Sequence, residues 1–372
     1  MDNIIQTMIK NEEEKKKEEK KNLGVGPCNH GIQGIKRVLG HNYDISIDEY
    51  MGKEKPPEDD TIIIIQDGGI GDTICSTVML KSAREVYKDK TIVLASFYPD
   101  VFLNNPNIDH LYATNSLNNM YEKWVKKLRW NKSLLKSDIY NGGVHKIFPG
   151  KLSEAICYYY KLPYQGDDIK VYLTEDEEKE AKIFLNSFPR DVILINVESA
   201  RINYKPDFKI TTNKDWYEDS WKELVSMLVK DFDVVQIGGP CEKPIEGITT
   251  NLTGQTNIRQ VMALIKHSLT TISIDSFIGH VSPAVGKSGV VLFGRSNPYI
   301  FGHETNVNIW VDNSCKLNDM FCGRPQSYWG DNKMIKGTTK LWECPDRSCM
   351  RAITPEMVYR KVFESIERNT KK

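Results

Sequence analysis

The chain has 372 residues, which is enough for two domains with additional segments. Its 50 Lys and Arg residues balance its 50 Asp and Glu residues, which argues against a protein held mainly by nucleic-acid phosphates or an acidic membrane surface. No apolar run approaches the ~20 residues of a membrane span, and the polar start does not resemble a signal peptide. The composition therefore predicts a cytoplasmic protein with at most peripheral membrane contact and no nucleic-acid partner.

Residues 1–60 are predicted to form a charged, flexible N-terminal arm. The run EEEKKKEEKK can pair Glu12 with Lys16 and Glu13 with Lys17 on a helix, but it offers little apolar face to pack. Such charge runs are usually solvated. The alternative is a docking arm that recruits a protein acceptor.

The stretch TIIIIQDGGIGDTICSTVML (61–80) predicts a buried strand, a glycine turn and a helix. Four consecutive isoleucines indicate a strand covered on both faces. Gly71 belongs to the turn, and Asp72 is expected to open the helix. A helix N-terminus that follows a strand offers free N–H groups and a positive dipole end, which keeps the Asp72 carboxylate ionised and suits a general base. The alternative reading of Asp72 is a simple N-cap.

Strands and helices alternate through the rest of the chain. Further strands are predicted at residues 91–97, 192–197, 233–239, 270–275, 289–294 and 307–310, with a short apolar segment at 111–114. Helices are predicted at residues 120–130, 152–162, 174–188, 216–230 and 257–267, and another from residue 281. This order predicts an α/β protein with two parallel-sheet halves facing one cleft, where ligands bind at the carboxyl ends of the strands.

The break at Pro189 suggests the division between the two halves. We expect one domain at residues 61–189 and a second at residues 190–312. A cysteine-containing segment with a C-terminal helix is expected at residues 313–372.

A second motif, ISIDSFIGHVSPAVG (272–286), is expected to face the same cleft. Asp275 closes a predicted strand, Ser276 can cap the following helix, and His280 lies one turn further on. Amides and an imidazole in this arrangement suit the phosphates of a nucleotide. The alternative reading is a capping Asp275 and a packing His280. Gly294 ends the next strand, where a base or ribose can pass close to the backbone.

Four cysteines gather near the C-terminus, namely Cys315, Cys322, Cys344 and Cys349. Cys344 and Cys349 have the spacing of zinc ligands, whereas the spacing of Cys315 and Cys322 is looser. They predict either a structural zinc or iron clip or four reduced cysteines packed as small apolar groups.

Six segments in order resemble the heptosyltransferases of glycosyltransferase family 9. They are GGIGDTICSTVMLKSARE, NNPNIDHLY, NKDWYEDSWKEL, NLTGQTNIRQVMALIKHS, ISIDSFIGHVSPAVG and VVLFG. The resemblance implies the GT-B fold, with two Rossmann-like domains and the donor bound in the C-terminal one. The family's CGRP…WECPxRxCM tail also resembles Cys322–Pro325 and Trp342–Met350.

The resemblance further implies inverting transfer of a sugar, typically heptose from ADP-heptose, with no cofactor for catalysis. The family's base falls on Asp72, and its basic residue before a tryptophan falls on Lys214, which would offset charge on the departing diphosphate. Glu242 matches an acidic position that contacts the ribose. The predicted donor-site residues are Gly71, Glu242, Asp275, Ser276, Gly279, His280 and Gly294. The acceptor would be a glycan, a lipid-linked glycan or a protein.

Two departures from the family pattern leave the donor open. Phe277 and Ile278 replace a Gly-Pro pair, while a glycine appears at Gly279. A His-Pro-Gly motif is also absent, and Ser199 and Arg201 are candidate substitutes as phosphate contacts. The alternative function is therefore a non-catalytic nucleotide- or glycan-binding protein of the same fold.

Overall fold

The computed structural model describes residues 61–66, 68–114, 120, 124, 134–136, 150–198, 214–240, 242–294, 296–311 and 347–371. The predicted arm at residues 1–60 and most of the predicted helix at residues 120–130 lie outside this part.

The first sheet has four parallel strands in the order β3-β2-β1-β4. They are β1 (Thr61–Gln66), β2 (Thr91–Ser96), β3 (His110–Ala113) and β4 (Leu134–Lys136). Ile62, Ile63 and Ile64 are at most 2% exposed, so the isoleucine run forms the predicted buried strand. The helices of this half are α4 (Ile70–Cys75), α5 (Val78–Val86) and α8 (Leu152–Tyr159), with a short 3-10 turn at Pro99–Val101.

The helix expected to open at Asp72 differs from the prediction in two ways. It begins two residues earlier, at Ile70, and it is interrupted between α4 and α5. At the interruption, the Ser76 hydroxyl donates to the Thr73 carbonyl at 2.7 Å and the Thr77 hydroxyl to the Ile74 carbonyl at 2.8 Å. Hydroxyls that bond the preceding turn compete with the helical ladder and bend it.

The second sheet has six parallel strands in the order β10-β9-β8-β5-β6-β7. They are β5 (Val192–Asn196), β6 (Asp233–Gln236), β7 (Thr250–Asn251), β8 (Thr270–Ile274), β9 (Val290–Phe293) and β10 (Val307–Trp310). Its helices are α9 (Glu175–Leu185), α10 (Glu218–Leu228), α11 (Ile258–His267), α12 (Phe277–Ala284), α13 (Pro298–Phe301), α15 (Ser348–Arg351) and α16 (Pro355–Thr370). Helix α12 begins at Phe277 with Ser276 at its N-cap, as the 272–286 motif predicts, and not at residue 281.

Both faces of the second sheet are buried. Ile193 and Ile195 of β5 pack with α10 and α16, whereas Val192 and Leu194 pack with α11 and α12. The apolar cluster that contains Val192 and Leu194 also contains apolar residues of β1, α4, α5 and α8. One apolar core therefore continues from the first sheet to the second. The predicted domain boundaries at residues 189 and 312 stay predictions.

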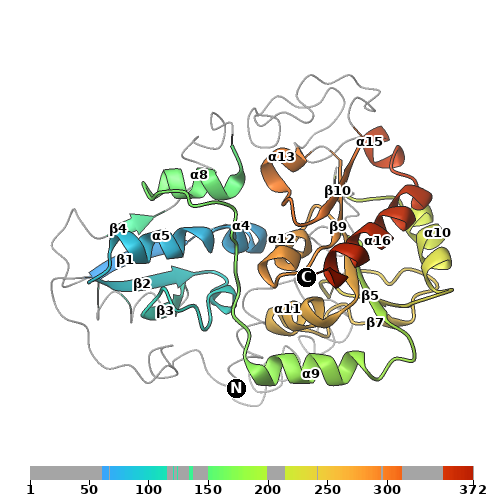
Figure 1. The fold of residues 1–372 in the computed structure, drawn as a ribbon, viewed down its shortest axis with the longest axis horizontal. Coiled ribbons are helices and arrows are strands. Elements are labelled where there is room, and N and C mark those ends of the chain that lie inside the picture. Colours follow the sequence, from blue (N-terminus) through green and yellow to red (C-terminus); the bar gives the residue numbers. More distant parts are fainter. Residues whose placement is uncertain are drawn as a thin grey trace, which may run out of the picture.

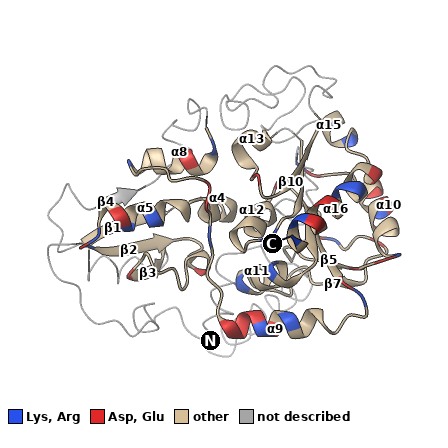
Figure 2. Cartoon of the chain, in the orientation of Figure 1, with Lys and Arg blue, Asp and Glu red and all other residues tan. Residues whose placement is uncertain are grey.

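The two halves lie side by side, with α4 directed toward α12 between them (Figure 1). Charged residues gather on α9 and α16, whereas α12 at the junction carries none (Figure 2). Among the described helices, none combines the length and the apolar character needed to cross a membrane.

Arg259 of α11 binds residues of two segments that come earlier in the chain than α11. This arginine is 2% exposed, and its guanidinium donates to both Glu177 oxygens at 2.7 and 2.6 Å. It also donates to the backbone carbonyls of Asp100 and Tyr172 at 3.1 and 2.7 Å. Glu177 is itself placed by the predicted capping box with Thr174. One buried cation therefore joins α9, α11 and the turn at Pro99–Val101.

We expect Arg259→Ala to lower the free energy of unfolding by about 3 kcal/mol, because it leaves a partly buried carboxylate and two carbonyls without their donor. The matched control is Lys266→Ala. Lys266 also lies on α11, but it is more exposed and pairs with Glu178 of α9, so its loss should cost less than about 1 kcal/mol. Denaturant titration measures both. Equal losses in the two variants would contradict a structural role for the buried arginine.

Candidate functional site

The N-termini of α4 and α12 meet at the junction of the two halves. Each helix follows a parallel strand, β1 and β8 respectively. A Cβ atom at Gly71 would lie 3.0 Å from Cδ2 and 3.4 Å from Nε2 of His280. Glycine at position 71 is thus what lets the two helices approach so closely.

Asp72 is the third residue of α4, and Gly69 occupies the N-cap position. The Asp72 carboxylate accepts a hydrogen bond from the Gly69 backbone N–H at 3.0 Å. Gly68 has a φ of 141°, which folds the turn against the Asp72 side chain. The simple N-cap reading of Asp72 is therefore wrong in position, because the carboxylate returns to the cap from inside the first turn.

The Asp72 carboxylate also acts on its surroundings. Burial raises the pKa of Tyr98, and the charge of Asp72 raises it further. The carboxylate therefore faces a tyrosine that stays protonated, at the carboxyl end of the first sheet.

Lys214 and Asp275 form an ion pair at 2.8 Å beside the start of α12. Their side chains are 18% and 5% exposed, and the Ser296 hydroxyl donates to the same Asp275 oxygen. Burial alone would raise the pKa of Asp275, but the charge and hydrogen bond of Lys214 lower it below the usual value. Asp275 is thus an ionised partner of Lys214 and Ser296, and the prediction that it acts as a cap is wrong.

Ser276 stands at the N-cap of α12, but its side chain makes no capping hydrogen bond. Its hydroxyl instead donates to Oδ1 of Asn196 at 2.8 Å, and the Asn196 amide donates to Oε2 of Glu242 at 3.3 Å. Glu242 accepts from the Gly239 N–H at 2.7 Å. A Cβ at Gly238 would lie 2.1 Å from the Glu242 carboxylate, so a side chain at position 238 would displace that carboxylate. Two predicted donor-site residues, Ser276 and Glu242, are thus connected through Asn196.

Two predicted glycines have structural explanations. A Cβ at Gly279 would lie 3.2 Å from Val291, so glycine here lets α12 pack on β9. Gly294 follows β9, and its carbonyl accepts from the Trp310 indole at 3.0 Å. Neither contact depends on a ligand.

A small pocket lies within the second half, beside α12. It has an empty volume of about 150 Å³ and is bordered by residues that include Asp275, Ser276 and His280. Ligand pockets usually enclose roughly 300–1,000 Å³. All of its lining residues belong to the second half, so it is not the predicted cleft between the two halves.

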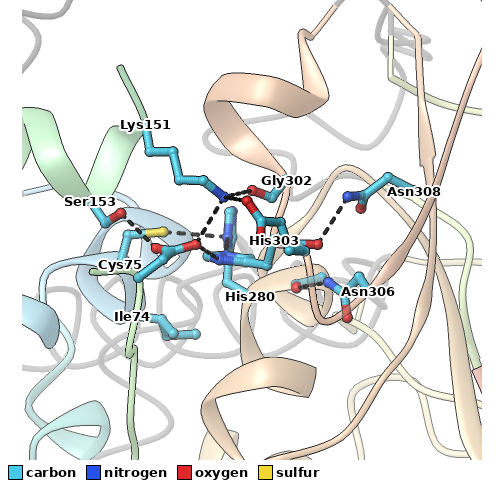
Figure 3. A network of polar contacts seen from close by, with 12 residues as sticks. Ile74, Cys75, Lys151, Ser153, His280, Gly302, His303, Asn306 and Asn308 are labelled. Carbon is cyan, nitrogen blue, oxygen red and sulfur yellow. Dashed lines mark hydrogen bonds and ion pairs between the residues drawn. The ribbon is translucent and has the colours of Figure 1, made fainter. Parts of the chain in front are cut away.

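His280 lies in a buried polar network that connects the two halves (Figure 3). Its Nδ1 lies 3.3 Å from Sγ of Cys75 and 2.8 Å from Nε2 of His303. His303 Nδ1 is 2.7 Å from Asp167, which also accepts from Ser153 at 2.6 Å. Burial, together with the neighbouring His303, lowers the pKa of His280 to about 3, so the imidazole is neutral.

The sequence analysis missed Cys75, His303 and Asp167 as members of this network. One signal was available for Cys75, because it lies three residues after Asp72 on a predicted helix and so shares a face with it. His303 and Asp167 come from irregular segments, for which spacing carries no such information.

Several predicted residues lie outside the described part of the chain. These are Ser199, Arg201, Cys315, Cys322 and Cys344. Cys349 is described and is partly exposed on α15. The C-terminal metal clip therefore stays a prediction.

Comparisons with known proteins agree with the geometry. The family model described as "Glycosyltransferase family 9 (heptosyltransferase)" matches residues 159–320. Lipooligosaccharide heptosyltransferase 2 of Haemophilus influenzae is 25% identical over 150 residues, which cover 36% of this chain and 43% of that protein. The chain spans 34% to 54% of the length of the curated relatives it matches.

Two solved structures share the fold. A family 9 glycosyl transferase from Veillonella parvula has a TM-score of 0.59 at 16% identity, covering 84% of this chain and 99% of that one. The dodecameric iron-containing heptosyltransferase TibC of enterotoxigenic E. coli, in complex with ADP-D-β-D-heptose, has a TM-score of 0.58 at 14% identity, covering 85% and 78%. Over residues 159–320 the chain is therefore similar to the heptosyltransferases of glycosyltransferase family 9, and it shares the GT-B fold of these solved structures.

Proposed function

We propose that this protein is an inverting glycosyltransferase that moves a sugar from a nucleotide-sugar donor to a hydroxyl of a glycan acceptor. The observation that carries the proposal is the Asp72 carboxylate on α4, placed opposite the α12 N-terminus and the pair of Lys214 with Asp275. ADP-heptose is the proposed donor, because TibC, which shares the fold, was solved with that compound.

The first half would supply the base. A sugar hydroxyl is a weak nucleophile, so a carboxylate must take its proton as its oxygen attacks the anomeric carbon. Asp72 is suited to this role, because Gly69 and the start of α4 hold it at the carboxyl end of β1. The new bond to the acceptor oxygen forms as the bond to the diphosphate breaks, which inverts the anomeric centre.

The second half would stabilise the leaving group. The diphosphate departs with its bonding electrons, and the Lys214 ammonium with the free amides of α12 would offset the charge. Lys214 is held for this by Asp275, which keeps the ammonium near the helix start. Glu242 and Asn196 lie on the other side of Ser276 and offer polar groups to a ribose.

A non-catalytic binding protein is the second candidate. Phe277 and Ile278 favour it, because they stand at positions where the family has smaller or more restricted residues. A parent protein that binds ADP but releases none from ADP-heptose, with or without acceptor, would favour this candidate.

We expect Asp72→Asn to lower kcat by about 10²–10⁴-fold, because the amide cannot accept the acceptor's proton. ADP affinity, measured by calorimetry, should stay nearly unchanged, since Asp72 lies on the acceptor side. Asp89→Asn, an exposed acid of the same half, serves as the control and should retain parental activity. Full transfer by the Asp72 variant would overturn the assigned base.

Lys214→Met should make stability depend on pH in a new way. In the parent, the lowered pKa of Asp275 stabilises the fold at neutral pH, and this contribution is lost as the pH falls through the lowered pKa. Without Lys214, burial raises that pKa, so the variant should lose about 3 kcal/mol at pH 7 and recover stability toward pH 4.

Denaturant titrations across this pH range measure the effect. Adding Asp275→Asn to the variant removes the buried charge and should abolish the new pH dependence. A Lys214→Met protein whose stability follows the parental pH profile would show that the ion pair does not control Asp275.

A further inference from the structure

Three side chains with metal-ligating atoms converge at the junction of the two halves. Sγ of Cys75, Nδ1 of His280 and Nε2 of His303 all lie within 4.8 Å of one another. The three residues are 1%, 7% and 4% exposed. They come from α4, from α12 and from the segment after α13, and Figure 3 shows them facing a common point.

The outer partner of His303 is the kind that supports a metal ligand. Asp167 accepts a hydrogen bond from Ser153 at 2.6 Å and pairs with the Lys151 ammonium at 3.3 Å, which is the environment of an ionised carboxylate. An ionised carboxylate can only accept, and His303 Nδ1 must therefore donate to it at 2.7 Å. Histidine ligands almost always donate their second ring N–H to such a group, which directs the other nitrogen at the metal.

Hydrogen bonding alone does not satisfy all three atoms. Nδ1 of His280 contacts both Cys75 Sγ and His303 Nε2, but one ring nitrogen offers either one proton or one lone pair. If Nδ1 donates to His303, the thiol cannot donate to it. If Nδ1 accepts, the thiol and His303 compete for one lone pair. A cation in the middle would accept electron pairs from all three atoms.

We propose that Cys75, His280 and His303 bind a divalent transition-metal ion, with Zn²⁺ as the best match to one thiolate and two imidazoles. Binding converts the Cys75 thiol to a thiolate and releases its proton to solvent. Tetrahedral zinc sets such ligand atoms about 3.3–3.6 Å apart. The observed 3.3 Å between sulfur and nitrogen fits this spacing, and the two nitrogens at 2.8 Å would move slightly apart.

The surrounding charges favour a cation. Cys75 faces the carboxylates of Asp167, Asp72 and Asp275, which Lys151 only partly offsets. A bound dication would change the net charge around the Cys75 sulfur from negative to positive. It would also put the remaining ring proton of His280 on Nε2, which lies at the side of the ring next to Gly71.

This site differs from the predicted C-terminal cysteine clip and goes beyond the proposed transfer reaction. Its ligands come from both halves and are buried, so the ion would hold α4 against α12. Metal binding at this site can therefore be tested without measuring sugar transfer.

The test is metal content and metal-dependent stability of the full chain. Protein freed of metal with a chelator is titrated with Zn²⁺, its stoichiometry is measured by mass spectrometry of the metal, and its Tm is recorded with and without Zn²⁺. Cys75→Ala and His303→Gln should each bind one equivalent less than the parent and lose the Zn²⁺-dependent rise in Tm. The matched control is Cys157→Ala, another buried free cysteine of the first half, which should behave as the parent.

Two further results decide the geometry. Asp167→Asn should keep the stoichiometry and weaken Zn²⁺ binding about 10–100-fold, because it loosens His303 without removing a ligand. Parental affinity in this variant would overturn the assigned ligand arrangement. Parental stoichiometry and Tm rise in both Cys75→Ala and His303→Gln would show that any metal binds elsewhere, and that the cluster is a hydrogen-bonded network only.

Discussion

The close contact of Gly71 with His280 is the constraint on which the junction depends. Each residue lies near the start of a helix that follows a buried parallel strand, so the contact brings together the carboxyl ends of two different sheets. Any side chain at position 71 would have to displace the imidazole. The close approach of α4 to α12 is what brings Asp72 near the ion pair of Lys214 with Asp275.

Burial of charge reinforces the same junction. Arg259 with Glu177 and Lys214 with Asp275 are both strongly shielded pairs in which one member is almost inaccessible to water. Buried pairs of this kind add little net stability over apolar replacements, but losing one partner is costly. They therefore specify which segments lie together more than they stabilise the fold, which is instead provided by the continuous apolar core.

The departures from the family pattern at 277 and 278 have a packing explanation. Ile278 is 1% exposed and belongs to the core shared by the two halves, and Phe277 packs against the same core. These side chains thus fill the space beneath the start of α12. The bulky Phe277 and Ile278 side chains, which left the donor open in the sequence, are thus packed against the core. The Phe277 backbone lies close to Gly71.

The sequence by itself determined the order of the longer strands and helices, because apolar runs and capping boxes are local signals, but it missed the short β4, β7, α13 and α15. The isoleucine run of β1, the capping box of α9 and the parallel α/β class followed from these signals, as did Asp72 and His280 as residues of interest. Lys214 came from the resemblance to the family. Only the tertiary structure decided their partners. The contacts of Asn196 with Ser276, of Asp167 with His303 and of His303 with His280 join residues that are 80, 136 and 23 positions apart, and no periodicity relates them. The break after Cys75 was also decided there, since hydroxyl–backbone hydrogen bonds of Ser76 and Thr77 interrupt the helix.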